Sequence, residues 1–499
     1  MKKLFSTFLV FVICLSLVCC KGGEGQGSKK NEYGTEGLFL SKYKVNCMNF
    51  DTASDNETVK QVDKQADKLR DTIVKLPDTL TAAKGGATYY VSESGSNTND
   101  GTSHENALKT AAALPKLNLK AGDVVLFERG GTYRGKFELV SGVSYGAYGK
   151  GDKPCLYGSR ENAAEHKWTL TEQENIYVYR YVVNNVGLVV FDHGQQTSVK
   201  KFEMDELRQN FDFCVKNSRL YLYCDKGNPA KLFNSIELCE DKNIITAPAG
   251  SHDITLENLQ IMYGGAHGFQ AVNSKNITVR GLVVGFIGGS VQPGYPGKNV
   301  RYGNGIEFWA SCDNILVDKC YVFQCYDDAI THQSIGEDVV ESNITYSNNL
   351  LEYNSSSFTY FIADSTQKSI MKNITITDNI IRYNCYGWGN ERPSNSLASG
   401  VSCGTVSQLE NNRSENFIIK NNVFDRARRN LIVFAAYKKE WLPTYYGNTY
   451  IQNEDKQLFA YQSEGYVKHK IFRADETGVR TVKDVLGDTA ATVVILPKQ

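Results

Sequence analysis

Three carboxylates gather in the second half of the chain, where Glu307 is followed by the adjacent pair Asp327 and Asp328. Like charges held close together raise the pKa of one partner, so such a cluster can supply one protonated acid and one ionised base. Hydrolysis of a glycosidic bond requires this division of roles. Two other uses remain open, which are capping of backbone N–H groups at a bend and binding of Ca²⁺ by oxygen ligands.

A repeated segment indicates which elements position these acids. Each copy begins with Asn or Asp and continues as an apolar–polar–apolar strand, and its lead apolar residues are Ile254, Ile277, Ile315, Ile344, Ile374 and Phe417. Seven places later stand Ile261, Val284, Val322, Leu351, Ile381 and Phe424. A side-chain type that returns to the same place in each copy indicates a solenoid of stacked parallel strands.

Asparagines mark one bend of this solenoid. Asn349, Asn379 and Asn422 each stand five places after a lead residue. Stacked side-chain amides can bond the coils above and below, and Asn tolerates the left-handed conformation of a tight bend. We therefore predict a structural role for this column.

Strand alternation predicts which side chains face outward beside the acids. The third strand of each coil gives the outward column Gln270, Glu307, Thr331, Tyr360 and Val433. Asp327 and Asp328 enter the next coil at a bend, on the order of 10 Å from Glu307 along straight strands. That distance overlaps the roughly 6.5–9.5 Å between the carboxylates of inverting glycosidases. The predicted catalytic residues are Glu307, Asp327 and Asp328, together with His332 if a bulge exposes it. Alternation otherwise points His332 into the core.

Two insertions frame the acids with aromatic and polar side chains. Residues 292–305 include Tyr302, and residues 386–393 include Trp388, Glu391 and Arg392. Aromatic faces stack on sugar rings while polar groups bond hydroxyls. The predicted substrate-binding residues are Tyr302, Tyr326, Tyr360, Trp388, Glu391, Arg392 and His267. Trp309 is a further candidate for the same face, and His267 is expected about 10 Å from Asp328.

Several motifs carry a resemblance to a known family. Tyr89-Tyr90-Val91-Ser92, the polar loop 95–102, the segment 122–127 and the Asn-Ile-Thr coils resemble the pectin-lyase-like superfamily over roughly residues 87–450. The resemblance implies an all-β fold, a right-handed parallel β-helix. Because this superfamily includes glycoside hydrolases, polysaccharide lyases and non-catalytic proteins, the resemblance does not decide the activity.

One catalytic motif of the superfamily is only partly matched. Asn304-Gly305-Ile306-Glu307 and the later Asp327-Asp328 are similar to the motif of polygalacturonase-type members. However, Asn304 occupies the place of their first Asp, and no Gly-His-Gly follows. The match implies a location for the site and no family mechanism.

The regions around the repeats have a different organisation. Residues 51–86 carry apolar residues at helical spacing, with Asp55 as the expected N-cap. Residues 87–450 are predicted to form the β-helix, whose first segments cap its open end. The repeat lapses between roughly 160 and 235, where 216–223 predicts a hairpin in an inserted lobe. Residues 451–499 are expected to form a closing segment.

The N-terminus resembles an export signal. Lys2 and Lys3 precede an apolar run from Leu4 to Val18. We predict a bacterial lipoprotein signal peptide at 1–20 with lipidation of Cys20, followed by a flexible tether at 21–50. Lipidation of Cys19 and an ordinary secretory signal are the alternatives. The expected location is the cell envelope, with the protein anchored to a membrane at the outer membrane or cell surface.

Composition narrows the classes of ligand. The 55 basic and 55 acidic residues balance, so nothing points to nucleic acid. The 13 cysteines are sparse for 499 residues and lack the spacing of a zinc site, so we expect mostly free, buried thiols. No cofactor is implied, apart from a possible Ca²⁺.

These observations favour a surface protein that cleaves a polysaccharide, with hydrolysis by paired carboxylates preferred. One alternative is a lyase, in which Tyr or His removes a proton beside a uronate while Arg or calcium neutralises the uronate carboxylate. A non-catalytic glycan-binding protein is the other alternative.

Overall fold

The computed structural model describes residues 52–498 except 181, 183–184, 295–299, 365, 392–405, 409–412, 436–438, 464–467 and 476. All the described residues belong to one compact unit. The predicted signal peptide (1–20), Cys20 and the tether (21–50) lie outside these residues. Within the described part of the chain, no helix has both the length and the apolar character needed to cross a membrane.

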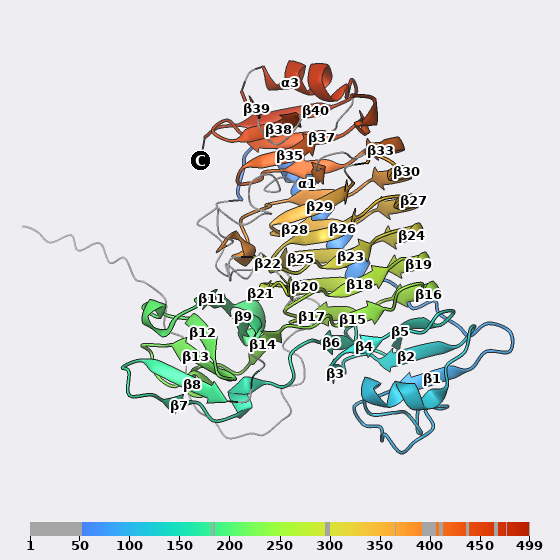
Figure 1. Cartoon of the computed structure of the whole chain (residues 1–499), viewed down its shortest axis with the longest axis vertical. Coiled ribbons are helices and arrows are strands. Elements are labelled where there is room, and N and C mark those ends of the chain that lie inside the picture. The colour runs from blue at the N-terminus through green and yellow to red at the C-terminus, as the bar shows by residue number, and fades with distance from the viewer. Residues whose placement is uncertain are drawn as a thin grey trace, which may run out of the picture. The chain divides into compact units, whose positions relative to one another are not determined.

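Three ten-stranded sheets run along the molecule and form the solenoid (Figure 1). Sheet A contains β1 (Thr88–Val91), β2 (Val124–Glu128), β5 (Ser144–Tyr148), β16 (His252–Glu257), β19 (Lys275–Arg280), β24 (Asp313–Asp318), β27 (Val340–Ser347), β30 (Ile370–Thr377), β33 (Ser414–Lys420) and β36 (Thr444–Tyr446). Sheet B contains β3 (Thr132–Arg134), β6 (Cys155–Tyr157), β17 (Gln260–Met262), β20 (Val283–Ile287), β25 (Tyr321–Cys325), β28 (Leu350–Glu352), β31 (Ile380–Arg382), β34 (Val423–Asp425), β37 (Thr449–Asn453) and β40 (Thr492–Leu496). Sheet C contains β4 (Phe137–Glu138), β15 (Ile245–Ala247), β18 (Phe269–Val272), β23 (Ile306–Trp309), β26 (Asp328–Ile335), β29 (Ser356–Ala363), β32 (Val406–Gln408), β35 (Asn430–Ala435), β38 (Gln457–Ser463) and β39 (Lys468–Arg473).

Each coil passes through sheet A, sheet B and sheet C in turn, and neighbouring strands pair in parallel. The last pair of sheet C, β38 and β39, is antiparallel and ends that sheet. The fold is the predicted right-handed parallel β-helix, the hand that crossover connections between parallel strands adopt.

The register confirms the repeat inferred from the sequence. Ile254, Ile277 and Ile315 are consecutive partners in sheet A, and the same column continues to Phe417. The second apolar column aligns in sheet B in the same way. Both columns point into one continuous core, in which nearly all these side chains are fully buried.

The asparagine column forms the expected amide ladder. The side-chain amide of Asn349 donates to Asn379, and that of Asn379 donates to Asn422, each at 2.9 Å. The ladder then continues through Asn448 and ends on the carboxylate of Asp488, also at 2.9 Å. Since these groups are buried, each amide meets a hydrogen-bonding requirement that water cannot meet.

The left-handed residues of the bend precede the ladder rather than forming it. Positive φ angles occur at Asn348, Asp378 and Asn421, one residue before each ladder asparagine. The Asn or Asp that opens each repeat is also left-handed, as Asn343 and Asn373 show. We predicted that the ladder asparagines themselves adopt the left-handed conformation. This was wrong by one position, because the residue before each of them adopts it.

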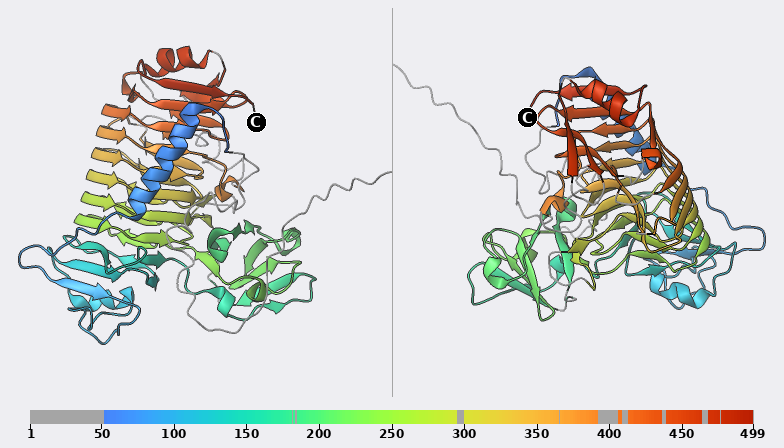
Figure 2. Two further views of the ribbon diagram at one scale, coloured as in Figure 1. Left: turned by 180° about the vertical axis from the view of Figure 1, so that it is seen from behind. Right: turned by 45° about the horizontal axis from the view of Figure 1, so that its top comes forward.

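Helix α1 (Glu57–Val74) lies along the outside of sheet B and crosses several coils (Figure 2). Asn56 caps it, not Asp55, because the Asn56 side chain accepts from the backbone N–H groups of Thr58 and Val59. Beneath the helix, Arg70 bonds both oxygens of Glu352 at 2.9 Å. Burial alone would raise the pKa of Glu352, but Arg70 and Arg382 lower it to about 2.

Residues 160–240 leave the solenoid and form two smaller sheets. The lobe contains β7 (Thr169–Leu170), β8 (Ile176–Arg180), β9 (Val186–Phe191), β10 (Gln196–Thr197), β11 (Val199–Lys200), β12 (Asp212–Lys216), β13 (Arg219–Tyr223), α2 (Pro229–Leu232) and β14 (Ile236–Glu240). Strands β12 and β13 pair as an antiparallel hairpin. After residue 450 sheets B and C continue, because β37 and β40 extend sheet B and β38 extends sheet C in parallel. A short helix, α3 (Gly478–Thr481), precedes β40.

Among the described cysteines, all except Cys155 are buried, and none forms a disulfide. This confirms the expectation of free thiols for residues 155, 214, 224, 239, 312, 320, 325 and 385. Cys47 and Cys403 lie outside the described residues.

Glu341 is a buried acid inside the solenoid. Its side chain is fully buried, and neither oxygen has a hydrogen-bond partner. The nearest cation-forming group is His332, whose Nε2 lies 4.0 Å away. Burial raises the pKa of Glu341 well above its ordinary value of 4.5 and lowers that of His332 to about 3. His332 is therefore uncharged near neutral pH, and burial favours the protonated, uncharged form of Glu341.

Replacing Glu341 with Met should stabilise the protein by about 1–3 kcal/mol near neutral pH, because it removes a buried unsatisfied carboxyl group. A raised carboxyl pKa contributes stability below pH 4.5 that is lost as pH rises. The gain from Glu341→Met should therefore grow between pH 4 and pH 8 in thermal unfolding. Glu138→Met, at an exposed glutamate, is the control, and a gain independent of pH would contradict this assignment.

Candidate active site

Asp327 and Asp328 lie at the corner between sheet B and sheet C, and Glu307 lies on the neighbouring strand β23, opposite Thr331 of β26. Val322 pairs with Leu351 and Asp328 pairs with Ser356, so this corner is one residue longer in the Asp328 coil than in the next. The additional residue lies beside Tyr326 and Asp327, just before β26 begins at Asp328. Asp327 is half-buried, whereas Asp328 is only 4 % exposed.

Because of this extra residue, one member of the predicted outward column is wrong. Glu307 pairs with Thr331, and Thr331 pairs with Thr359. Tyr360 was predicted to face outward because the sequence count assumed corners of equal length. It instead lies in the core, where its ring stacks on His332 with centroids 5.8 Å apart.

Four hydrogen-bonding groups surround the carboxylate of Glu307. Asn304 and Gln333 donate to Oε1 at 3.0 and 2.7 Å. Gln270 donates to Oε2 at 2.6 Å, and His267 Nε2 lies 3.1 Å from the same oxygen. A carboxylate offers about four acceptor positions, so these donors occupy all of them. Glu307 is therefore held as an oriented, buried negative charge.

The Asn304 amide connects Glu307 to the Asp328 corner. While its Nδ2 donates to Glu307, its Oδ1 accepts from the backbone N–H of Asp328 at 3.0 Å. The Asp328 carboxylate accepts from Thr359 in the following coil at 2.5 Å. Three successive coils are thus joined at the site by side-chain hydrogen bonds.

His267 contacts Glu307 directly. The backbone N–H of Asn304 donates to His267 Nδ1 at 3.1 Å, so the ring proton is on Nε2 and points to Glu307. The edge of the ring meets Tyr302, with centroids 5.2 Å apart. Tyr302 belongs to the short strand β22 (Arg301–Tyr302), which pairs with β21 (Ser290–Val291).

Tyr302 links the site to the inserted lobe. Its hydroxyl donates to Asp241 at 2.9 Å, and Asn185 donates to the other oxygen of Asp241 at 2.8 Å. Burial, followed by the nearby Asp241, raises the pKa of Tyr302. A neutral phenol is thereby favoured, and the lobe forms one wall of the site.

Two of the predicted sugar-binding aromatics are packing residues. Trp388 is 2 % exposed, and its indole N–H donates to the carbonyl of Gln324 at 2.6 Å. Tyr326 is fully buried between Trp388 and the guanidinium of Arg301, which lies 4.4 Å from the ring centroid. Aromatic composition alone could not distinguish such a packed cluster from a binding face.

Glu391 and Arg301 connect the lobe to the solenoid. Arg301 forms an ion pair with Glu391 at 2.6 Å and also donates to the carbonyl of Gly187 in the lobe. Glu391 in turn accepts from the backbone N–H of Lys200 at 3.3 Å. The side chain of Glu391 is thus engaged in a structural contact rather than presented to a ligand. Arg392 lies outside the described residues.

His332 faces the interior of the solenoid. It is 1 % exposed, and its Nδ1 lies 3.0 Å from the hydroxyl of Tyr346. No bulge exposes it, so His332 points inward as strand alternation predicts. The predicted catalytic role of His332 is therefore wrong, because the side chain lies in the core.

The outer face of sheet C carries a row of half-buried side chains beside Glu307. Trp309, Gln333 and Phe361 are consecutive cross-strand partners, and all three are half-buried. Trp309 stands two residues after Glu307, so both side chains project from the same face. An aromatic–amide–aromatic row of this kind can stack on sugar rings and bond their hydroxyls.

Sequence reasoning missed several residues of the site. Gln333 stands two places after the predicted outward residue Thr331, so alternation alone could have identified it. Thr359 was missed because of the longer corner. Asp241 and Asn185 come from the lobe, where no periodic pattern predicts their position.

Among the described residues, no group of three or more His, Cys, Asp or Glu side chains could hold a metal ion. The possible binding of Ca²⁺ by the carboxylate cluster stays a prediction.

Comparisons with known proteins add little beyond architecture. No protein-family model matches the chain, and neither does any curated protein. Similar solved structures include one titled "Glycoside hydrolase", with a TM-score of 0.45, 8% identity and coverage of 83% of this chain and 95% of that chain. Pectate lyase Pel9A gives a TM-score of 0.39 at 11% identity over 84% of this chain and 80% of that chain. A lacto-N-biosidase of family GH136 from Eubacterium ramulus gives 0.38 at 14% identity over 88% and 70%.

These values are too low to carry an argument about activity. The three parallel sheets themselves establish the parallel β-helix fold. The chain is a parallel β-helix protein with a polar, carboxylate-rich site at one corner.

The two tryptophans near the site should behave differently when they are replaced. Trp388→Ala should cost about 3–5 kcal/mol of stability, because it leaves a large cavity. Trp309→Ala should change stability much less, since that side chain is already half-exposed. Chemical denaturation would measure the stability of both variants. Equal destabilisation by the two variants would contradict this division of roles.

Proposed function

We propose that this protein hydrolyses a polysaccharide at the corner formed by Asp327 and Asp328. The observation that carries the proposal is the pair of hydrogen bonds made by the Asn304 side chain. Its amide donates to the carboxylate of Glu307 and accepts from the backbone N–H of Asp328, so the strand that carries Glu307 is tied to the corner that carries the two aspartates. The substrate chain would lie on the outer face of sheet C, over the row Trp309, Gln333 and Phe361.

In the proposed reaction, water attacks the anomeric carbon and the bond from that carbon to the leaving oxygen breaks. Asp327 accepts a proton from the water, because it is the more exposed of the two acids. Asp328 gives its proton to the leaving oxygen. Glu307 has no acceptor position left for a proton, so it serves as a fixed negative charge that stabilises the positive charge developing on the sugar ring.

This role for Glu307 differs from the acid–base pairing that the sequence suggested. A carboxylate with four donors can exchange a proton only after losing one of them. The adjacent aspartates are therefore better placed for proton transfer, and Glu307 for orientation and charge.

The same contacts argue against the lyase alternative. A lyase requires a base, yet both nitrogens of His267 are engaged and the pKa of Tyr302 is raised. It also requires a group that neutralises a uronate carboxylate, and among the described residues of the site the arginine, Arg301, is 3 % exposed and paired with Glu391. Hydrolysis is therefore the function that the geometry supports best.

The proposed location remains the cell envelope, through lipidation of Cys20. The support is the sequence pattern of residues 1–20 alone. Labelling of the expressed protein with a radioactive fatty acid, lost in Cys20→Ser, is the direct measurement.

The proposed activity is tested by incubating the purified protein with a panel of polysaccharides and analysing the products by mass. Asp327→Asn and Asp328→Asn should each lower the turnover rate by about 10²–10⁴-fold, as expected when a general acid or base is removed. Both variants should unfold at nearly the wild-type temperature.

Asp338→Asn is the matched control, because Asp338 is exposed and left-handed, a conformation that Asn tolerates. It should retain full activity. Full activity in both Asp327→Asn and Asp328→Asn would end the proposal. Unsaturated, ultraviolet-absorbing products would establish the lyase instead, and glycan binding without any product would establish a binding protein.

A further inference from the structure

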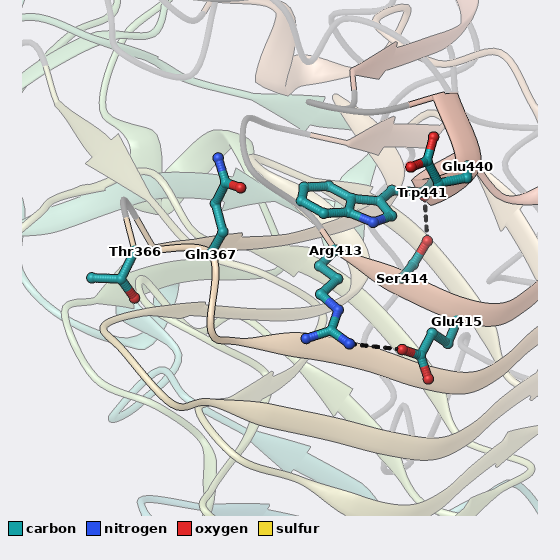
Figure 3. A pocket seen from close by; sticks show the side chains of 7 residues that line it. All are labelled: Thr366, Gln367, Arg413, Ser414, Glu415, Glu440 and Trp441. Carbon is teal, nitrogen blue, oxygen red and sulfur yellow. Dashed lines mark hydrogen bonds and ion pairs between the residues drawn. The ribbon is translucent and has the colours of Figure 1, made fainter.

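A cavity lies at another corner of the solenoid, where sheet C turns into sheet A (Figure 3). Three segments line it, at 366–367, 413–415 and 440–441, and its volume is about 580 Å³. Ligand pockets in proteins usually measure about 300–1,000 Å³, so the cavity is large enough for a small ligand.

The first wall of the cavity is fixed by Asp364. Its Oδ1 accepts from the backbone N–H and the hydroxyl of Thr366 at 2.7 and 2.6 Å. Its Oδ2 accepts from the backbone N–H groups of Lys368 and Ser369. Although burial would raise the pKa of Asp364, these donors hold it well below its ordinary range. The turn that presents Thr366 and Gln367 is therefore rigidly anchored.

The opposite wall is held in a similar way. The hydroxyl of Ser414 donates to the carbonyl of Trp441, which ties two successive coils together. Arg413 forms an ion pair with Glu415 at 2.9 Å. Figure 3 shows the indole of Trp441 reaching toward Gln367, with Arg413 below it in this view.

These side chains offer the chemistry of a sugar site. The half-buried indole of Trp441 can stack on the apolar face of a pyranose ring. Gln367 and Arg413 supply hydrogen-bond donors, while Glu415 and Glu440 supply acceptors. The hydroxyl groups of a sugar could therefore both accept and donate hydrogen bonds here. One cation against two carboxylates disfavours an anionic ligand, because bringing like charges together is costly.

This cavity is separate from the carboxylate corner. Asp328 pairs with Ser356, the first residue of β29, whereas the cavity begins beyond Ala363, the last residue of that strand. An eight-residue strand spans about 26 Å, so the two sites lie at opposite ends of sheet C. No single sugar ring can contact both.

We propose that the Trp441 cavity is a second glycan-binding site, which takes uncharged sugar residues and holds a polysaccharide to the protein without cleaving it. Two linked sites raise the effective concentration of a polymer at the first of them. The inference does not depend on Asp327 or Asp328, because binding at this cavity requires no reaction.

The test is binding of neutral oligosaccharides of glucose, xylose, galactose and mannose to the purified protein, with oligogalacturonate as the anionic comparison. Trp441 is one of four tryptophans in the chain, so binding at its ring should change the intrinsic fluorescence. Trp441→Ala should remove the part of that change that comes from its ring, so that in a Trp309→Ala background the change is abolished, and it should weaken binding of the tightest neutral oligosaccharide about tenfold or more, equivalent to about 1.4 kcal/mol.

Tyr446→Ala is the matched control, since Tyr446 is a 57 % exposed aromatic on the adjacent strand β36 and does not line the cavity. It should bind like the wild type. Trp441→Ala should also cleave short soluble substrates at the wild-type rate, so loss of this site is distinguishable from failure of the proposed hydrolysis. Unchanged binding in Trp441→Ala, or tighter binding of oligogalacturonate than of every neutral sugar, would overturn the inference.

Discussion

The amide of Asn304 is the interaction on which the candidate site depends. It is 2 % exposed and joins the carboxylate of Glu307 to the backbone of Asp328 in the next coil. A buried amide that lost either partner would pay the cost of an unsatisfied polar group, so the two coils are held in one relative position. The substitution of Asn for the Asp of polygalacturonase-type motifs therefore has a physical meaning here, since an amide can both donate and accept whereas a carboxylate only accepts.

The same logic operates along the whole solenoid. Parallel strands bring equivalent positions of successive coils within about 4.8 Å, and buried amides such as Asn349 and Asn379 convert that spacing into a ladder of hydrogen bonds. A rigid stack can then tolerate one irregular corner, where the extra residue lies beside Asp327. The inserted lobe closes the site from the side through Asp241 and Tyr302. The solenoid and the site are thus stabilised in the same way. In both, a side chain of one coil forms a hydrogen bond with the backbone or a side chain of the next coil.

Much of the fold could be predicted from the sequence, because the columns led by Ile254 and Ile261 recur with the same side-chain character and must share one core. The position of Glu307 on the outer face followed from strand alternation. The roles of Tyr360, Trp388 and Tyr326 could not be predicted, since a single added residue at a corner reverses which side chains face outward, and an aromatic residue packs as readily as it binds. Contacts made by the lobe, such as that of Asn185 with Asp241, join residues that no repeat aligns. The four-donor environment of Glu307 also required coordinates, because only two of its donors lie in positions that the repeat marks.

The central claim is that a sugar chain lies over the Asp327–Asp328 corner on the outer face of sheet C. The most direct measurement is a crystal structure of the Asp328→Asn protein soaked with an oligosaccharide that the wild type cleaves. Electron density for a sugar ring is expected at the corner, with Asp327 facing its anomeric carbon and a more distant ring of the same oligosaccharide against Trp309. Density at any other surface, with the corner occupied by water alone, would contradict it.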